Sequence, residues 1–167
     1  MRPVDGGEVA AGSPLVTIGR ARLGNRAAVA HAIRAMQVRG APLIGVTAAY
    51  GVAIALGVDA SNDSLEQALA TLATTRPTAV NLHWALARMA GRLRPLPPAE
   101  RKAAAWAEAA AIADEDVAQN KAIGEHGLTL LRHLSPRQGK TIHLMTHCNA
   151  GWLATVDWGT ALSPIYA

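Results

Sequence analysis

Apolar residues recur every three or four positions along most of the chain, which is the spacing of helices that bury one face. Within residues 25–37 this spacing predicts one helix, with Asn25 as its N-cap. A nearly continuous apolar run over 42–56 predicts a second helix, buried on all sides. It begins at Pro42, a favoured first-turn residue, and Gly57 is suited to end it.

Three further helices are predicted over 63–74, 77–93 and 99–133. Asp63 and Glu66 have the spacing of a capping box at the start of the first, and Pro77 is placed to begin the second. The third is long and rich in Ala, with Gly124 and Gly127 as the positions where an interruption is expected. The chain up to residue 134 therefore reads as a helical domain.

After this domain the spacing of apolar residues is no longer that of helices alone. Residues 135–139 are turn-forming, Thr141–Met145 has the composition of a short buried strand, and Asn149-Ala150-Gly151 breaks it before a short helical stretch. Strand, loop and helix in this order begin a parallel α/β unit, whose strand has Leu15–Ile18 as its one candidate partner. An apolar strand without partners is costly, so we expect an incomplete second domain.

The predicted fold class is α/β overall, with a mainly helical domain followed by the first strand, loop and helix of a truncated Rossmann-like domain. Three segments follow from this assignment. They are a loose or incomplete N-terminal segment over 1–24, the helical domain over 25–134, and the start of the Rossmann-like domain over 135–167.

Composition narrows the function classes. The chain has 167 residues, 50% of them hydrophobic, and only 4% aromatic, which suits close-packed helices. One cysteine excludes an internal disulfide and a cysteine-rich zinc site, and indicates a reducing, cytoplasmic setting. The run over 41–56 is shorter than the roughly 20 residues of a membrane span, so no membrane association is expected. The first 14 residues lack the continuous apolar region of a secretory signal.

The net charge of +4 raises the question of an acidic partner. The basic residues are mostly arginines spread along the chain, without a polybasic tract or interleaved aromatic residues. We therefore expect no nucleic-acid partner, and a small phosphorylated ligand instead.

Arg39 and Arg76 share a local arrangement that suits such a ligand. Each lies just before a proline that can begin a helix, and helix N-termini present unpaired N–H groups to anions. Gly40 and Gly45 permit close approach of the backbone to a ligand. Two surface arginines beside ordinary turns would explain the same pattern, because a single motif of this kind is weakly specific.

Cys148 follows the predicted strand at its carboxyl end, where open α/β sheets bind ligands. A thiol there could act as acid, base or nucleophile, and an inert buried cysteine is the alternative. His143 and His147 do not have the spacing of a metal pair in an extended segment, and no metal is expected. Asn81 and Asn149 could orient a sugar hydroxyl, or serve only as capping or core residues.

Several motifs taken together resemble one family, the methylthioribose-1-phosphate isomerases. They are Met36-Gln37-Val38-Arg39-Gly40-Ala41-Pro42-Leu43-Ile44-Gly45, Arg76-Pro77-Thr78-Ala79-Val80-Asn81-Leu82, Asp116-Val117-Ala118-Gln119-Asn120 and Thr146-His147-Cys148-Asn149-Ala150-Gly151. The resemblance covers nearly all of the chain from about Ala32, in order and spacing. It implies an aldose–ketose isomerase of methionine salvage. Such an enzyme converts 5-methylthioribose 1-phosphate to 5-methylthioribulose 1-phosphate without a metal or organic cofactor.

The resemblance also assigns roles to residues. It implies that Cys148 is the catalytic thiol, that Arg39 and Arg76 hold the phosphate, and that Gly40, Ala41 and Asn149 contact the substrate. It implies a second catalyst, an Asp of a C-terminal α/β domain that opens the sugar ring. That Asp is expected beyond Ala167, because Asp157 does not match its position.

Three further expectations come with this family. The resemblance implies a homodimer for the full-length proteins of the family. It leaves open whether a chain without the ring-opening Asp is active or is an inactive fragment. The same motifs reach the ribose 1,5-bisphosphate isomerases and the regulatory subunits of a translation-initiation exchange factor. A non-catalytic module that binds phosphosugars is therefore the alternative function, although the motif around Cys148 favours an isomerase.

Overall fold

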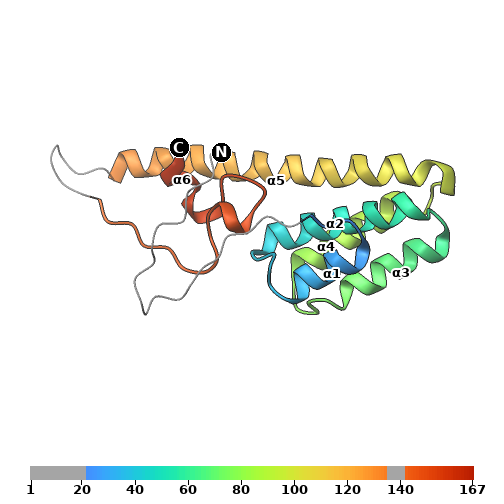
Figure 1. Cartoon of the computed structure of the whole chain (residues 1–167). Coiled ribbons are helices and arrows are strands. Elements are labelled where there is room, and N and C mark those ends of the chain that lie inside the picture. Colours follow the sequence, from blue (N-terminus) through green and yellow to red (C-terminus); the bar gives the residue numbers. More distant parts are fainter. Residues whose placement is uncertain (1–21, 135–141) are drawn as a thin grey trace.

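The computed structural model describes residues 22–134 and 142–167 of the chain. Four helices pack together beside one long helix, and a short segment of irregular chain and small helical turns follows (Figure 1). The elements are α1 (Arg26–Arg34), α2 (Ala41–Val58), α3 (Asn62–Ala73), α4 (Val80–Leu93), α5 (Pro98–Leu134), the 3₁₀ turns η1 (Trp152–Ala154) and η2 (Thr160–Leu162), and α6 (Ser163–Tyr166).

Helix α2 is the centre of the bundle and contacts α1, α3, α4 and α5. Its mean hydropathy of 1.9 over 18 residues would suit a membrane span by length and composition alone. Its surroundings are those of a core helix, because Ala48, Ala49, Val52 and Ala53 are fully buried among the other helices. The buried helix predicted over 42–56 is thus confirmed, with slightly wider bounds.

The N-caps of α1 and α3 test two predictions from local pattern. The Asn25 side chain accepts a hydrogen bond from the Ala28 N–H at 2.8 Å, as expected for the cap of α1. The capping box at Asp63 is wrong. The Ser61 hydroxyl caps α3 by accepting from the Ser64 N–H, and Asp63 lies inside the first turn.

Helix α4 begins three residues later than predicted, at Val80 instead of Pro77. The Ala79 N–H donates to the Arg76 carbonyl oxygen at 3.0 Å, which closes a turn before the helix starts. Ala79 is then extended, with φ −81° and ψ 97°, and serves as the N-cap. Helix α1 also ends early, at Arg34, because the chain turns and Met36 takes a φ of 56°.

Helix α5 runs without interruption for 37 residues, about 55 Å at 1.5 Å per residue. The break considered at Gly124 or Gly127 does not occur. Instead, these glycines let α6 approach: a Cβ at Gly127 would lie 2.3 Å from Pro164 Cγ, and one at Gly124 would lie 3.0 Å from the Ser163 carbonyl oxygen. The N-terminal half of α5 lies along the bundle, and its C-terminal half carries η2 and α6 (Figure 1).

The strand predicted over 141–145 is not formed at residues 142–145, which are irregular. Ile142, Leu144 and Met145 expose their side chains, Met145 almost completely. The described residues offer no neighbouring strand, and a single strand cannot satisfy its own backbone groups. The predicted partner strand, Leu15–Ile18, and Thr141 lie outside the described residues. Beyond Gly151 the expected helix is replaced by η1, η2 and α6.

Candidate functional site

A cleft of about 680 Å³ lies between two turns of the bundle and the segment that carries the cysteine. All six residues predicted as site residues line it, together with Asn81. The lining consists of Met36, Arg39, Gly40, Ala41, Ile44, Arg76, Thr78, Ala79, Val80, Asn81, Cys148 and Asn149. Four parts of the chain thus meet there: the α1–α2 turn with the start of α2, the α3–α4 turn, the start of α4, and residues 148–149.

The first wall is the turn from Arg39 into α2. Gly40 is the N-cap of α2, and its φ of 93° with ψ of 136° is a conformation that favours glycine. Its carbonyl oxygen accepts the first helical hydrogen bond, from the Ile44 N–H at 3.1 Å. The N-terminus of an 18-residue helix therefore borders the cleft, and its leading N–H groups favour an anion there.

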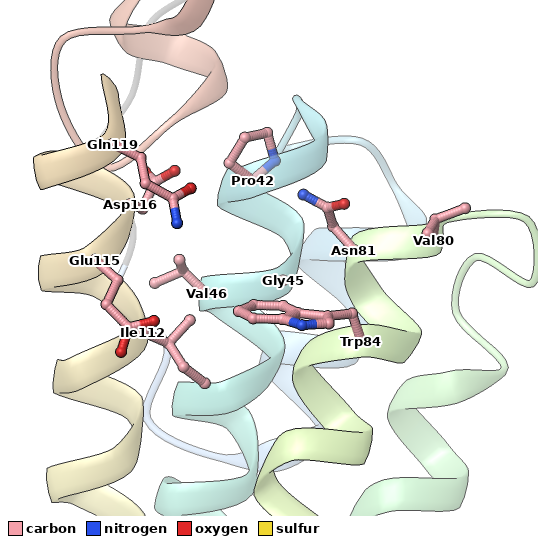
Figure 2. Close-up of a pocket in the computed structure, with 10 residues that line it drawn as sticks. All are labelled: Pro42, Gly45, Val46, Val80, Asn81, Trp84, Ile112, Glu115, Asp116 and Gln119. Atoms are coloured by element: carbon pink, nitrogen blue, oxygen red, sulfur yellow. The ribbon is translucent and has the colours of Figure 1, made fainter. Parts of the chain in front are cut away.

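The second wall is the turn at Arg76 and the start of α4. The side chain of Asn81 lies near that of Pro42, across the gap between α4 and α2 (Figure 2). Arg39 is exposed and Arg76 is half-buried. Within residues 22–134 and 142–167, neither guanidinium pairs with a carboxylate, so both cations remain available to a ligand.

The third wall is formed by Cys148 and Asn149. Cys148 is exposed, so it is not the inert buried cysteine that was the alternative. Cys148 has a φ of 79°, in the left-handed region that is uncommon outside glycine. His143 and His147 are exposed and do not line the cleft.

A second cavity of about 390 Å³ adjoins this cleft and shares Val80 and Asn81 with it. It lies between α2, α4 and α5, with the ring of Trp84 reaching toward α5 (Figure 2). Glu115, Asp116 and Gln119 of α5 supply its polar lining. Sequence reasoning missed this cavity. The one indication of it was the motif over 116–120, which entered only through a resemblance.

Burial raises the pKa of Asp116 above its ordinary value, against the opposing effect of two hydrogen bonds to the carboxylate. The donors are the Val156 N–H at 2.8 Å and the Asn120 side-chain amide at 3.0 Å. Both bonds favour the charged form of the carboxylate. They replace part of the water that burial removes from it.

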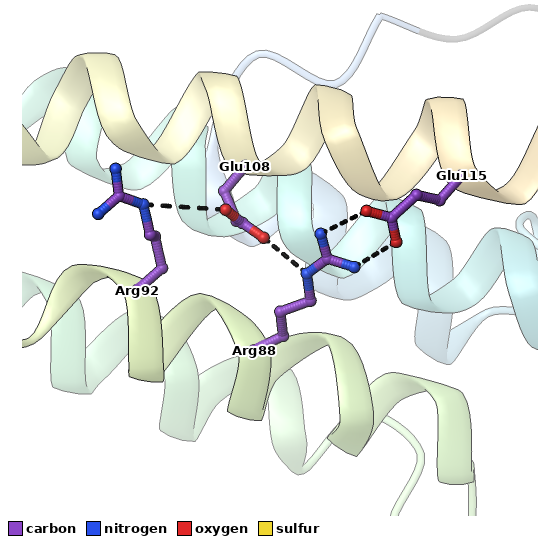
Figure 3. A network of polar contacts seen from close by, with 4 residues as sticks. All are labelled: Arg88, Arg92, Glu108 and Glu115. Carbon is purple, nitrogen blue, oxygen red and sulfur yellow. Dashed lines mark hydrogen bonds and ion pairs between the residues drawn. The ribbon is translucent and has the colours of Figure 1, made fainter.

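Beside this cavity, Arg88 of α4 bridges two carboxylates of α5 (Figure 3). Its Nε donates to Glu108 at 2.6 Å, and its two terminal nitrogens bind Glu115, one of them at 2.8 Å. Arg92 lies 3.9 Å from the other oxygen of Glu108. The network fixes the side chain of Glu115 at the wall of the cavity, and Arg88 also lies 5.6 Å from the Trp84 ring.

Known proteins resemble this chain over most of its length. It is 72% identical over 138 residues to a methylthioribose-1-phosphate isomerase of Dechloromonas aromatica, which covers 83% of this chain and 38% of that protein. It is 62% identical over 145 residues to the methylthioribose-1-phosphate isomerase of Methylorubrum populi, covering 87% of this chain and 40% of that protein. The chain thus spans about two fifths of the length of these relatives.

Two solved structures have a similar fold. The translation initiation factor eIF-2B, subunit delta, from A. fulgidus matches with a TM-score of 0.74 and 38% identity, over 87% of this chain and 43% of that one. The 5-methylthioribose 1-phosphate isomerase from Pyrococcus horikoshii matches with a TM-score of 0.72 and 40% identity, over 83% and 39%. The model of the initiation factor 2 subunit family matches residues 37–166, so the chain belongs to that family.

Proposed function

We propose that this chain carries part of the active site of an aldose–ketose isomerase that converts 5-methylthioribose 1-phosphate to 5-methylthioribulose 1-phosphate. The observation that supports this most is the cleft itself. Two arginines that pair with no carboxylate of residues 22–134 and 142–167 line the same space as the one cysteine of the chain. The substrate is suggested by the names of the relatives that are 59 to 72% identical.

The phosphate is held at the α1–α2 turn in this proposal. Arg39 and Arg76 neutralise its charge from two sides, and the leading N–H groups of α2 add the positive end of a helix dipole. Gly40 and Ala41 line the cleft beside the phosphate, and Asn149 exchanges a hydrogen bond with a sugar hydroxyl.

The chemistry then requires two groups. The phosphate on C1 blocks simple opening of the ring to a free aldehyde, so an acid must protonate the ring oxygen as the C1–O bond breaks. Hydrogen passes from C2 to C1, which oxidises C2 to a ketone, reduces C1 and leaves the overall formula unchanged. Cys148 takes part in that transfer, whether hydrogen moves as a proton or as a hydride. The ring-opening acid is assigned to an Asp of a C-terminal α/β domain.

We further propose that residues 135–167 belong to the start of this Rossmann-like domain, in a cytoplasmic protein that acts as a homodimer. Ile142, Leu144 and Met145 support the first part, because a cluster of exposed apolar side chains this dense is what a buried strand shows before its sheet is complete. The relatives, which are more than twice as long, have room for such a domain.

Ligand-induced stabilisation tests the phosphate site first. Addition of 5-methylthioribose 1-phosphate is expected to raise the Tm of the chain, and Arg39→Gln and Arg76→Gln are expected to reduce the shift. Arg132→Gln, an exposed arginine near the end of α5, is the matched control and should leave the shift unchanged. No shift with the unsubstituted chain would overturn the proposal.

Turnover tests the thiol. Where the chain forms the ketose, Cys148→Ser is expected to abolish it while the Tm shift remains; turnover that survives this change contradicts the role of Cys148. Binding without turnover by a protein that also contains the ring-opening Asp supports the alternative, a non-catalytic phosphosugar-binding module, which the likeness to an initiation factor subunit favours. A larger shift with ribose 1,5-bisphosphate would point to the related bisphosphate isomerases.

A further inference from the structure

Two side chains of α5 fasten the segment that follows the cysteine. The Val156 N–H donates to Asp116 Oδ2 at 2.8 Å, and the Thr160 N–H donates to Asn120 Oδ1 at 2.7 Å. Asp116 and Asn120 are four residues apart and share one face of α5, and their two partners are also four apart. The segment is therefore held in a single register along the helix.

The Asn120 side chain is fixed in this orientation by its own environment. It is 3% exposed, and its amide nitrogen donates both to the Asp116 carbonyl oxygen at 2.8 Å and to Asp116 Oδ1 at 3.0 Å. With the nitrogen occupied by these acceptors, the side-chain oxygen is directed to the Thr160 N–H. Loss of either partner would leave a buried polar group unsatisfied.

The same segment contacts the cleft on its other side. A Cβ at Gly40 would lie 2.3 Å from Ala154 Cα, so the backbone at Ala154 rests directly on the N-cap of α2. Ala154 and Thr155 are buried, and Cys148 lies only six residues before Ala154. The hydrogen bonds from α5 and the contact with Gly40 thus enclose the segment between two helices.

We propose that Asp116 and Asn120 are positioning residues for the candidate site: by holding the N–H groups of Val156 and Thr160 they set where Cys148 lies relative to Arg39 and Arg76. The use of a phosphosugar as the ligand rests on the function proposed above. The hydrogen bonds themselves do not, so they can be tested without a ligand.

Amide exchange of the ligand-free chain is the first test. Asn120→Ala and Asp116→Ala are expected to raise exchange across residues 148–163 by about tenfold, while the amides of α2 keep their rates. Asp116→Asn retains an oxygen that can accept from Val156 and should restore most of the protection. Unchanged exchange over 148–163 in both alanine variants would overturn the inference, whatever the ligand.

Protection of the thiol is the second test. In the unsubstituted chain, 5-methylthioribose 1-phosphate is expected to slow alkylation of Cys148, because ligand and thiol share the cleft. Asn120→Ala should keep the ligand-induced rise in Tm, because that rise depends on binding by the two arginines. In this variant the ligand should slow alkylation of Cys148 about tenfold less than in the unsubstituted chain. Equal protection in this variant would overturn the inference. Absence of a Tm shift in the unsubstituted chain would instead contradict the proposed function.

A stability control separates positioning from general weakening. Arg101 is 3% exposed at the start of α5 and donates to the carbonyl oxygens of Leu93 and Ala60 at 3.1 and 3.2 Å. Arg101→Met is therefore expected to lower the Tm while leaving the protection of Cys148 at its usual level. If Arg101→Met reduced the protection as much as Asn120→Ala does, the effect would be one of stability, and the positioning role would be refuted.

Discussion

The backbone of Gly45 in α2 lies directly against the backbone of Asn81 in α4. A Cβ at Gly45 would come within 2.8 Å of the Asn81 carbonyl oxygen, closer than side-chain carbons approach an oxygen. This contact lies one turn into α2 and at the second residue of α4, just beyond the turns that carry Arg39 and Arg76. It therefore determines how far apart the two proposed phosphate ligands are held.

Gly45→Ala is expected to destabilise the chain by about 1–3 kcal/mol, because the backbone of α4 must move to accept the methyl group. The same shift separates the two arginine turns, so the phosphosugar-induced rise in Tm should also shrink. Gly91→Ala is the matched control within α4. A Cβ there meets nothing within 4 Å, and the change should stabilise by about 1 kcal/mol through helix propensity. Equal effects of the two substitutions in thermal unfolding would contradict the contact.

Gly40→Ala is expected to be more disruptive at the cleft. The added Cβ would overlap Ala154, and the φ of 93° is unfavourable for alanine, which alone costs on the order of 1–3 kcal/mol. Thermal unfolding and Cys148 alkylation should both change, since the segment that follows the cysteine has to move. Gly57→Ala, near the C-terminal end of the same helix, has no neighbour within 4 Å. It should not lower the Tm, because alanine favours the helix, and should leave the alkylation of Cys148 unaltered.

Ser61→Ala tests the cap of α3. The hydroxyl accepts from the Ser64 N–H and donates to Asp59 at 2.8 Å, so its removal should cost about 1 kcal/mol. Asp63→Ala should cost only a few tenths of that, because Asp63 interacts with the helix dipole and does not cap. Urea unfolding of the two variants measures the difference. If Asp63→Ala lowered the free energy of unfolding more than Ser61→Ala does, the capping box predicted from the sequence would be supported.

Acid should weaken the network around Arg88. Hydrogen bonds from Arg88 hold the pKa of Glu115 below its usual value of 4.5. A carboxyl whose pKa is lowered in the folded state stabilises the fold above its usual pKa, and this contribution is lost as the pH falls through the lowered value. Arg88→Gln should therefore lower the Tm by about 2 to 4 °C at pH 7.

The difference in Tm between the unsubstituted chain and Arg88→Gln should stay constant down to about pH 5 and shrink below it. Lys121→Gln, at an exposed position on α5, the helix of Glu115, should show no such dependence. A difference that persists unchanged at pH 3 would assign the effect to packing of the Arg88 stem instead of its charge.

Local pattern predicted the helices because each buries apolar side chains at helical spacing, and α2 buries half of its residues. It failed where two local preferences compete. Pro77 suits a first turn, but the Arg76–Ala79 hydrogen bond ends the preceding turn there and delays α4 to Val80. Local pattern also failed for the strand predicted over 141–145. A strand forms only beside neighbouring strands, and a local pattern does not show whether these are present.

Arg39, Arg76 and Cys148 of the candidate cleft could be predicted from the sequence because each carries a recognisable local feature, an arginine before a proline or the single cysteine. Ala41 was predicted only through the resemblance to a family. Sequence patterns did not predict the adjoining cavity. They also did not predict that Asp116 and Asn120 accept hydrogen bonds from residues 40 positions further along. These contacts depend on the packing of α2, α4 and α5, and a carboxylate and an amide four residues apart are common on any helix face.

The length of α5 has a consequence for the order of folding. Its N-terminal half is buried against the bundle through Ala105, Ala109 and Ile112, and each helix of the bundle also packs against the helix that follows it in sequence. Contacts of short sequence separation form fastest, so the bundle is expected to assemble first and to template the rest of α5. The segment after Cys148 then docks onto a helix that already exists, and the last step of folding is the one that completes the cleft.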